Sequence, residues 1–433
     1  MNIRPFEIAL IAIFAIAGIA GLFILSTYQA TPDASTKLYG DKVEIWGTLD
    51  EKIVNDFILE ISKTNVAVQV VEYIQKDAWT FEDELLNAIA DGESPDLVIL
   101  PHTLLVTYRS KLQSISFETI SERSFRDSYI DGAEIFMRSD GIFGIPFAVD
   151  PLVMYWNKDI FGGVGLAVPP KTWEGLMSET SRSLVERDSN FEITQSAVAF
   201  GEYDNVKHAK DVLSMLLFQA GSSIIDEREG TYSVTLHKGD ENVLPPGDAV
   251  LSFYTQFSTP SSETYSWNRS MELDRTEFVR GNLALYFGAG SERPAIEREN
   301  ANLNYDIASV PQGSDATIKR DFGTFYAFAI PRASKNIQGA YGVATLFTDE
   351  VNSKALTQSL GFAPVRRSLF TGTTGDAYDD VLYQSALIAR GWLDPSPEES
   401  DDVFRTMIEE MHKGQARTES IILDTVQELE DLF

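Results

Sequence analysis

Residues 42–100 constrain the fold most, because short apolar runs of strand length alternate there with amphipathic helical periods. Residues 42–46, 66–73 and 97–100 are the expected strands. Helices are expected from Glu51, behind a capping box formed by Thr48 and Glu51, and from about Thr80. The order β-α-β-α-β is typical of an open α/β sheet, whose ligands bind beyond the carboxyl ends of the strands.

Length and composition narrow the class of protein. A chain of 433 residues is too long for one hydrophobic core and predicts two or three domains. Its net charge of −30 argues against nucleic acid as a partner, because phosphates require lysine and arginine stripes. The chain has no cysteine, which excludes disulfides and thiol chemistry, and its four histidines show no metal-ligand spacing. We therefore expect neither a metal nor a cofactor.

The first thirty residues differ from the rest. Residues 8–25 are an uninterrupted apolar run, longer than a signal-peptide core and about right for one membrane span. Arg4 precedes this run and Asp33 follows it, so the positive-inside rule leaves the bulk of the chain outside the cytoplasm. We expect residues 1–29 to be an N-terminal transmembrane helix that stays uncleaved, with a removed signal as the alternative, and residues 30–40 to be a tether.

Residues 141–161, GIFGIPFAVDPLVMYWNKDIF, suggest a crossing between two lobes. A proline turn and a single acid, Asp150, precede an apolar run of strand length. Tyr155 and Trp156 in that run are expected to pack the sheet. An acid at such a crossing would face a cleft.

Three runs carry a family resemblance: IPFAVD (145–150), YWNKD (155–159) and PKTWE (170–174). They resemble extracellular solute-binding proteins of the maltose-binding, carbohydrate type, which deliver ligands to ABC importers. Three weaker landmarks follow the expected order: PDLV (95–98), GNLAL (281–285) and GFAP (361–364).

The resemblance implies a two-lobed α/β fold of the periplasmic-binding-protein kind, type II-like, with hinge closure around a ligand. Lobe 1 would comprise residues 41–149 plus 311–361, and lobe 2 residues 150–310 plus 362–433. A membrane-tethered monomer that binds a small solute, most simply a carbohydrate, and docks on ABC permease subunits is the implied function.

A sugar binder needs carboxylates or amides for hydroxyl groups and aromatic rings for stacking. Asp150 matches the position of a ligand-contacting acid in maltose-binding members, although a turn aspartate before proline is the alternative. The full set of candidate ligand contacts is Trp46, His102, Asp150, Trp267, Phe287 and Thr324. The alternative is core packing for Trp46 and an ordinary loop histidine for His102. For Phe287 and Thr324 the alternative is that they only end or begin a strand. Trp267 stands in a polar stretch without an obvious packing reason.

Two departures from the family pattern argue against a malto-oligosaccharide ligand. Ser291 and Glu292 stand where maltose-binding members place a tryptophan, and residues 101–104 lack their acid and arginine pair.

Two other functions remain open from the sequence alone. One is a sensor or adhesion ectodomain, and the other is a glycoside hydrolase using two carboxylates. No nucleophile elbow, zinc-protease motif or phosphate loop appears, so catalytic residues are not expected.

Overall fold

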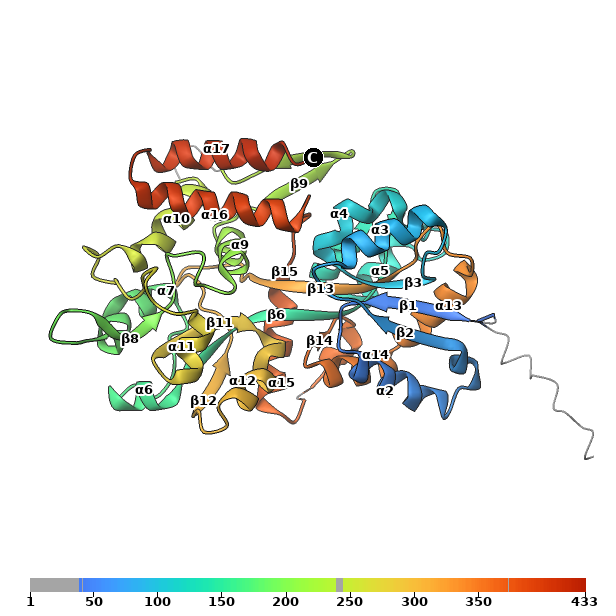
Figure 1. Ribbon diagram of the computed structural model, residues 1–433, viewed down its shortest axis with the longest axis horizontal. Coiled ribbons are helices and arrows are strands. Elements are labelled where there is room, and N and C mark those ends of the chain that lie inside the picture. The colour runs from blue at the N-terminus through green and yellow to red at the C-terminus, as the bar shows by residue number, and fades with distance from the viewer. Residues whose placement is uncertain (1–38, 41, 239–243, 373) are drawn as a thin grey trace, which may run out of the picture.

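The computed structural model describes residues 39–433 except 41, 239–243 and 373 (Figure 1). The predicted membrane span at residues 8–25 and most of the tether lie outside this described part. Within it, no helix combines the length and the apolar character needed to cross a membrane.

Two α/β lobes lie side by side and are joined by long strands that run across the middle of the molecule (Figure 1). The strands are β1 (Val43–Gly47), β2 (Val71–Gln75), β3 (Leu97–Pro101), β4 (Met137–Arg138), β5 (Gly141–Ile142), β6 (Ile145–Asn157), β7 (Glu186–Arg187), β8 (Ile193–Val198), β9 (Ile225–Arg228), β10 (Thr231–Val234), β11 (Leu283–Ala289), β12 (Tyr305–Ala308), β13 (Asp321–Ala329), β14 (Ala363–Pro364) and β15 (Ala389–Arg390). The predicted α/β class and its two-lobed arrangement are therefore confirmed.

Helices cover both halves of the large sheet (Figure 1). They are α2 (Glu51–Ser62), α3 (Phe81–Asp91), α4 (Leu105–Tyr108), α5 (Glu122–Ser128), α6 (Lys158–Gly163), α7 (Trp173–Gly175), α8 (Ser181–Leu184), α9 (Ala209–Gln219), α10 (Pro246–Thr255), α11 (Asp274–Arg280), α12 (Arg293–Glu299), α13 (Ile337–Phe347), α14 (Glu350–Leu360), α15 (Ala377–Ile388), α16 (Pro397–Lys413) and α17 (Thr418–Glu430). Short 3₁₀ helices include η2 (Val66–Val70), η4 (Arg109–Lys111), η5 (Asp131–Phe136) and η8 (Gly290–Glu292).

Strand β6 belongs to both lobes. All 13 of its residues are buried. Its first half pairs antiparallel with β13, which continues to β3, β1 and β2 of the first lobe. Its second half pairs antiparallel with β11 and β12, and β11 continues to β8 of the second lobe. The apolar stretch after Asp150 thus forms a crossing strand, and Tyr155 and Trp156 pack in its core as expected.

The local structure corrects two of the sequence predictions and confirms a third. The side chain of Asp50, not Thr48, caps α2 by accepting a hydrogen bond from the backbone N–H of Ile53 at 3.1 Å, so the predicted capping box is wrong. The first half of the expected strand at residues 66–73 is the 3₁₀ helix η2. Thr172 caps α7 as expected, accepting from the N–H of Gly175 at 3.1 Å.

Candidate functional site

Helix α9 separates two cavities, and each of its ends lines one of them. Its N-terminal residues line a cavity of about 690 Å³, which we call the cleft cavity. Its C-terminal residues line a cavity of about 790 Å³, which we call the hinge cavity. Both volumes fall in the range of small-molecule sites. Residues from both lobes line each cavity, so a ligand in either would touch both.

The cleft cavity is lined by the turn before α3, by residues 203, 204 and 206–211 of the second lobe and by the first turns of α16. Trp79, in the turn before α3, is 94% exposed, although a ring of that size is usually buried. The backbone N–H of Trp79 donates to the carboxylate of Asp77 at 2.8 Å, which fixes the turn that presents the ring. The cavity therefore has a free aromatic face at its rim.

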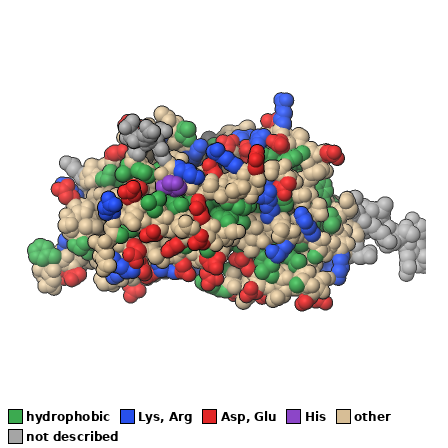
Figure 2. Space-filling model, turned by 90° about the horizontal axis from the view of Figure 1, so that it is seen from above, with side chains coloured by type: hydrophobic (Ala, Val, Ile, Leu, Met, Phe, Trp, Pro, Cys, Tyr) green, Lys and Arg blue, Asp and Glu red, His purple; other side chains and the backbone are tan. Residues whose placement is uncertain are grey.

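Charged side chains make up most of the remaining wall. They are the acids Glu82, Asp204, Asp211, Glu398, Asp401 and Asp402 and the bases Lys207, His208, Lys210 and Arg405. Arg405 is held by Asp204, Asp401 and Asp402. Lys210 Nζ is held by Asp394 Oδ2 at 2.7 Å. Figure 2 shows acidic side chains gathered along the lower middle of one face, between the lobes. Such pre-positioned carboxylates and ammonium groups can bind several hydroxyl groups at once.

A buried hydrogen-bonded network lies behind this wall. His208 bridges two carboxylates, with Nδ1 at 2.8 Å from Asp211 and Nε2 at 2.5 Å from Glu292. Burial alone would lower the pKa of His208, but the bonds to Asp211 and Glu292 outweigh it and raise the pKa to about 10. Burial likewise works against the charge of Glu292, yet the hydrogen bond from His208 brings its pKa to about 2. The pair is therefore ionised at neutral pH.

Asp150 lies next to this network and is 9% exposed. It accepts hydrogen bonds from the backbone N–H and the hydroxyl of Ser291. Burial raises the pKa of Asp150 to about 7, against the lowering effect of the Ser291 bonds. Thr324 lies directly opposite Asp150 in the ladder between β13 and β6 and is half-buried. These two predicted residues are thus brought together at the crossing.

His102 follows β3 and is completely buried. Its Nδ1 accepts a hydrogen bond from the backbone N–H of Phe325 at 3.2 Å, and burial lowers its pKa to about 3. Its ring packs against Gly391, where a Cβ would lie 2.3 Å from Nε2. The imidazole is neutral and exposes no atom to the cleft cavity in this conformation.

Three predicted aromatic contacts do not line the cleft cavity. Trp46 is half-buried, and the ammonium group of Lys76 sits 3.6 Å from its ring centre. Phe287 is buried and stacks on Trp173, with ring centres 5.9 Å apart. Trp267 is fully buried and its Nε1 donates to Asn205 at 3.0 Å. The premise that Trp267 lacks a packing reason is therefore wrong.

Sequence reasoning missed Trp79. The available signal was its position in the segment Asp77-Ala78-Trp79-Thr80, which links the expected strand at residues 66–73 to the helix expected from Thr80. This segment follows the carboxyl end of that strand, where ligands of an open α/β sheet bind. No group of three acid or histidine side chains suited to a metal occurs among the described residues.

Two α/β lobes sharing long strands, with a polar cavity between them, define a two-lobed solute-binding protein. The chain matches the sequence model of the family described as bacterial extracellular solute-binding protein over residues 53–383, and it belongs to that family. The resemblance to extracellular solute-binding proteins, which the sequence motifs indicated, is therefore confirmed.

Among its relatives, the galactooligosaccharide-binding protein of Bacillus subtilis (strain 168) is 21% identical over 345 residues, covering 79% of this chain and 76% of the relative. A maltooligosaccharide ABC transporter solute-binding lipoprotein of Streptococcus pneumoniae (serotype 4) is 20% identical over 381 residues, covering 86% and 85%. These relatives are binding proteins rather than enzymes, which agrees with the expectation of no catalytic residues.

Solved structures show the same fold at low identity. A cyclo/maltodextrin-binding protein complexed with maltotetraose superposes with a TM-score of 0.70 at 15% identity, covering 90% of this chain and 97% of that one. A solute-binding protein of Thermotoga lettingae bound with α-D-tagatose gives 0.66 at 19% identity, covering 91% and 100%.

Proposed function

We propose that this protein captures a carbohydrate in the cleft cavity and delivers it to an ABC importer. The observation that carries the proposal is Trp79, a 94% exposed indole on the rim of a cavity whose wall is otherwise charged. Sugars present flat C–H faces and a ring of hydroxyl groups, so they suit an aromatic platform beside fixed carboxylates. Two relatives, a galactooligosaccharide-binding protein and a maltooligosaccharide-binding lipoprotein, support the same ligand class.

The proposal includes a membrane tether and a permease partner. Residues 8–25 would anchor the chain and leave both lobes outside the cytoplasm, where the lobes proposed at 41–149 plus 311–361 and 150–310 plus 362–433 can close on the ligand. Importer subunits would then recognise the closed form. A monomer is sufficient for this role.

Calorimetric titration of the full-length chain in mild detergent against galacto-, malto- and manno-oligosaccharides tests the ligand class. We expect at least one to bind, and Trp79→Ala to weaken that binding at least about tenfold, because truncation of an aromatic residue that dominates an interface costs about 2 kcal/mol or more. Phe191→Ala is the matched control, since Phe191 is 82% exposed but does not line the cleft cavity. The ligand assignment fails if no oligosaccharide gives heat, or if both variants bind as the unchanged protein does.

A further inference from the structure

The hinge cavity is separate from the cleft cavity, and no residue lines both. Helix α9, which contributes its first residues to the cleft cavity and its last residues to the hinge cavity, has 11 residues and is therefore about 16 Å long. Helix η5 of the first lobe, the end of α9 and strand β9 of the second lobe, and the segment around β15 form its walls.

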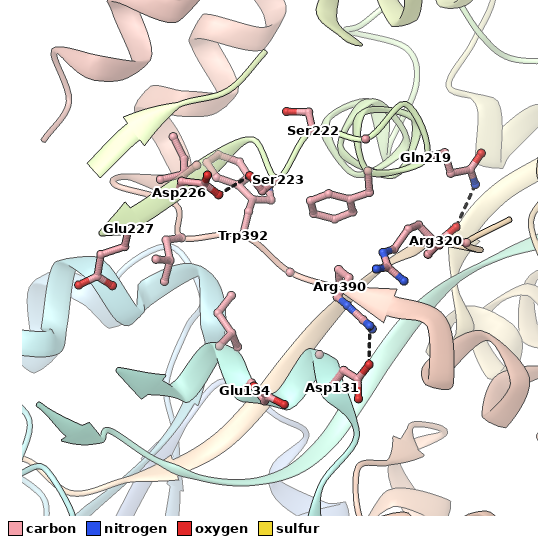
Figure 3. A pocket seen from close by; sticks show the side chains of 18 of the residues that line it. Asp131, Glu134, Gln219, Ser222, Ser223, Asp226, Glu227, Arg320, Arg390 and Trp392 are labelled. Atoms are coloured by element: carbon pink, nitrogen blue, oxygen red, sulfur yellow. Dashed lines mark hydrogen bonds and ion pairs between the residues drawn. The ribbon is translucent and has the colours of Figure 1, made fainter. Parts of the chain in front are cut away.

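Two arginines, Arg320 and Arg390, project into this cavity side by side (Figure 3). The guanidinium of Arg390 donates to Asp131 Oδ2 at 2.9 Å. The other oxygen of Asp131 is already taken by Arg367 at 2.6 Å. Burial lowers the pKa of Arg390, and the neighbouring positive charge of Arg320 lowers it further. Asp131 is thus shared by two arginines, while Glu134 and Glu227 of the same wall are paired with Arg126 and with Arg109 and Arg138.

The charge of Arg320 helps to lower the pKa of Asp131, but the two side chains do not form a direct ion pair. The only hydrogen bond of the Arg320 guanidinium within the described residues goes to the backbone carbonyl of Lys319 at 3.1 Å, and it forms no ion pair there. In a chain of net charge −30, with 65 acids and 35 lysines and arginines, most exposed arginines can form an ion pair with a nearby carboxylate. A guanidinium left free inside a concave site is therefore available to a ligand.

The main chain of Arg320 is nevertheless held firmly. Its carbonyl oxygen accepts from the side-chain amides of both Gln219 and Gln312 at 3.0 Å, and its N–H donates to the side-chain oxygen of Gln312 at 3.0 Å. Gln219 is itself fixed by the indole N–H of Trp173 at 2.6 Å. Two glutamines thus position a residue whose own side chain forms no ion pair within the described part of the chain. This arrangement pre-organises the arginine for a ligand.

We propose that the hinge cavity is a second binding site, which takes a small organic anion through a carboxylate or phosphate group held between Arg320 and Arg390. Planar guanidinium groups bind such oxyanions in a bidentate manner. The apolar part of the anion would lie against Trp392 and Phe218, which also line the cavity. This site is independent of the proposed carbohydrate site, so either proposal can fail without the other.

Titration of the full-length chain with succinate, citrate, inorganic phosphate and glycerol 3-phosphate tests the site and separates the carboxylate from the phosphate source. We expect at least one of these anions to bind. Arg320→Gln and Arg390→Gln should each weaken that binding at least tenfold, and Arg320→Lys should weaken it less because it retains the charge. Arg320→Gln removes no ion pair, so it keeps the test valid if Arg390→Gln disturbs folding.

Two control variants locate the bound anion. Trp79→Ala alters only the cleft cavity, and Arg123→Gln removes an exposed arginine that lies outside both cavities. Both should bind the anion as the unchanged protein does. The proposal is overturned if none of the four anions binds, if binding survives in Arg320→Gln, or if Trp79→Ala abolishes it.

Discussion

Asp150 and Ser291 are joined by two hydrogen bonds, one from the backbone N–H at 3.0 Å and one from the hydroxyl at 2.6 Å. They connect the middle of β6 to η8, which follows β11. Because both oxygens of the carboxylate are used in this way, the acid at the crossing is held in one orientation. Its energetic effect depends on whether it carries a proton.

Asp150→Asn should flatten part of the dependence of stability on pH. The folded state binds the proton up to about pH 7, whereas the unfolded chain releases it near 3.8, so stability falls as pH rises between these values. The slope is at most about 1.4 kcal/mol per pH unit. Urea unfolding at about pH 5 and pH 8 should show a larger loss for the unchanged protein than for the variant. Equal losses would contradict the raised pKa.

His208→Gln should act in a different pH range. The folded pKa of about 10 lies above the ordinary value of 6.5, so the stabilisation by the charged imidazole is complete below about pH 6.5 and is lost as pH rises through 10. The difference in unfolding free energy between the unchanged protein and His208→Gln should therefore shrink from pH 7 to pH 10. A difference that stays constant over this range would show that His208 is neutral when folded.

Gly391→Ala should destabilise the protein by about 1–3 kcal/mol, because the added Cβ would lie 2.3 Å from Nε2 of the buried His102. His102→Ala makes space for it, so the double variant should be more stable than the sum of the two single effects predicts. Gly162→Ala is the control, since nothing lies within 4 Å of its added Cβ. Additive effects in urea unfolding would mean that the two residues do not meet.

Glu227→Gln should favour separation of the lobes. Glu227 on β9 accepts from Arg109 at 2.7 Å and from Arg138 at 3.2 Å, and both arginines lie in the first lobe. Replacing the carboxylate by an amide removes its negative charge and leaves one acceptor oxygen for two arginines, so at least one hydrogen bond worth about 1.5–3 kcal/mol is lost. Small-angle scattering without ligand should give a larger mean radius of gyration for this variant.

Glu60→Gln serves as the control for that experiment, because Glu60 pairs with Lys63 within α2 and both side chains are exposed. Its radius of gyration should equal that of the unchanged protein. If Glu227→Gln also leaves the radius unchanged, the ion pairs do not govern lobe separation.

Local patterns predicted the beginning of the first lobe well. The alternation over residues 42–100 depends on neighbours in sequence, and β1, α2, α3 and β3 form where the periods indicate. Residues 226–263 have no sustained hydrophobic period, so their sequence predicts no regular element, yet most of β9 and all of β10 and α10 form there. The β10 residue Tyr232 stacks on Phe433, with ring centres 4.3 Å apart, so a contact from the far end of the chain helps to hold this hairpin.

The candidate site was less predictable because exposure depends on tertiary packing. Trp267 and Trp79 both stand in polar surroundings in the sequence, but the first is buried and the second is almost fully exposed. Asn205, which satisfies the indole of Trp267, lies 62 residues earlier. No local pattern reports such a partner. Asp150 was located by its resemblance to a family position, and its role as a ligand contact stays a prediction.

Because the two sheet halves each hold one end of β6, neither lobe is a module that can be cut out and expressed alone. A fragment without this strand would expose unpaired backbone edges of β13 and of β11, which promote aggregation. Genetic recombination in this protein would therefore have to exchange surface loops rather than whole lobes. Any engineered fusion should likewise be attached at a terminus or a loop and leave the crossing strand whole.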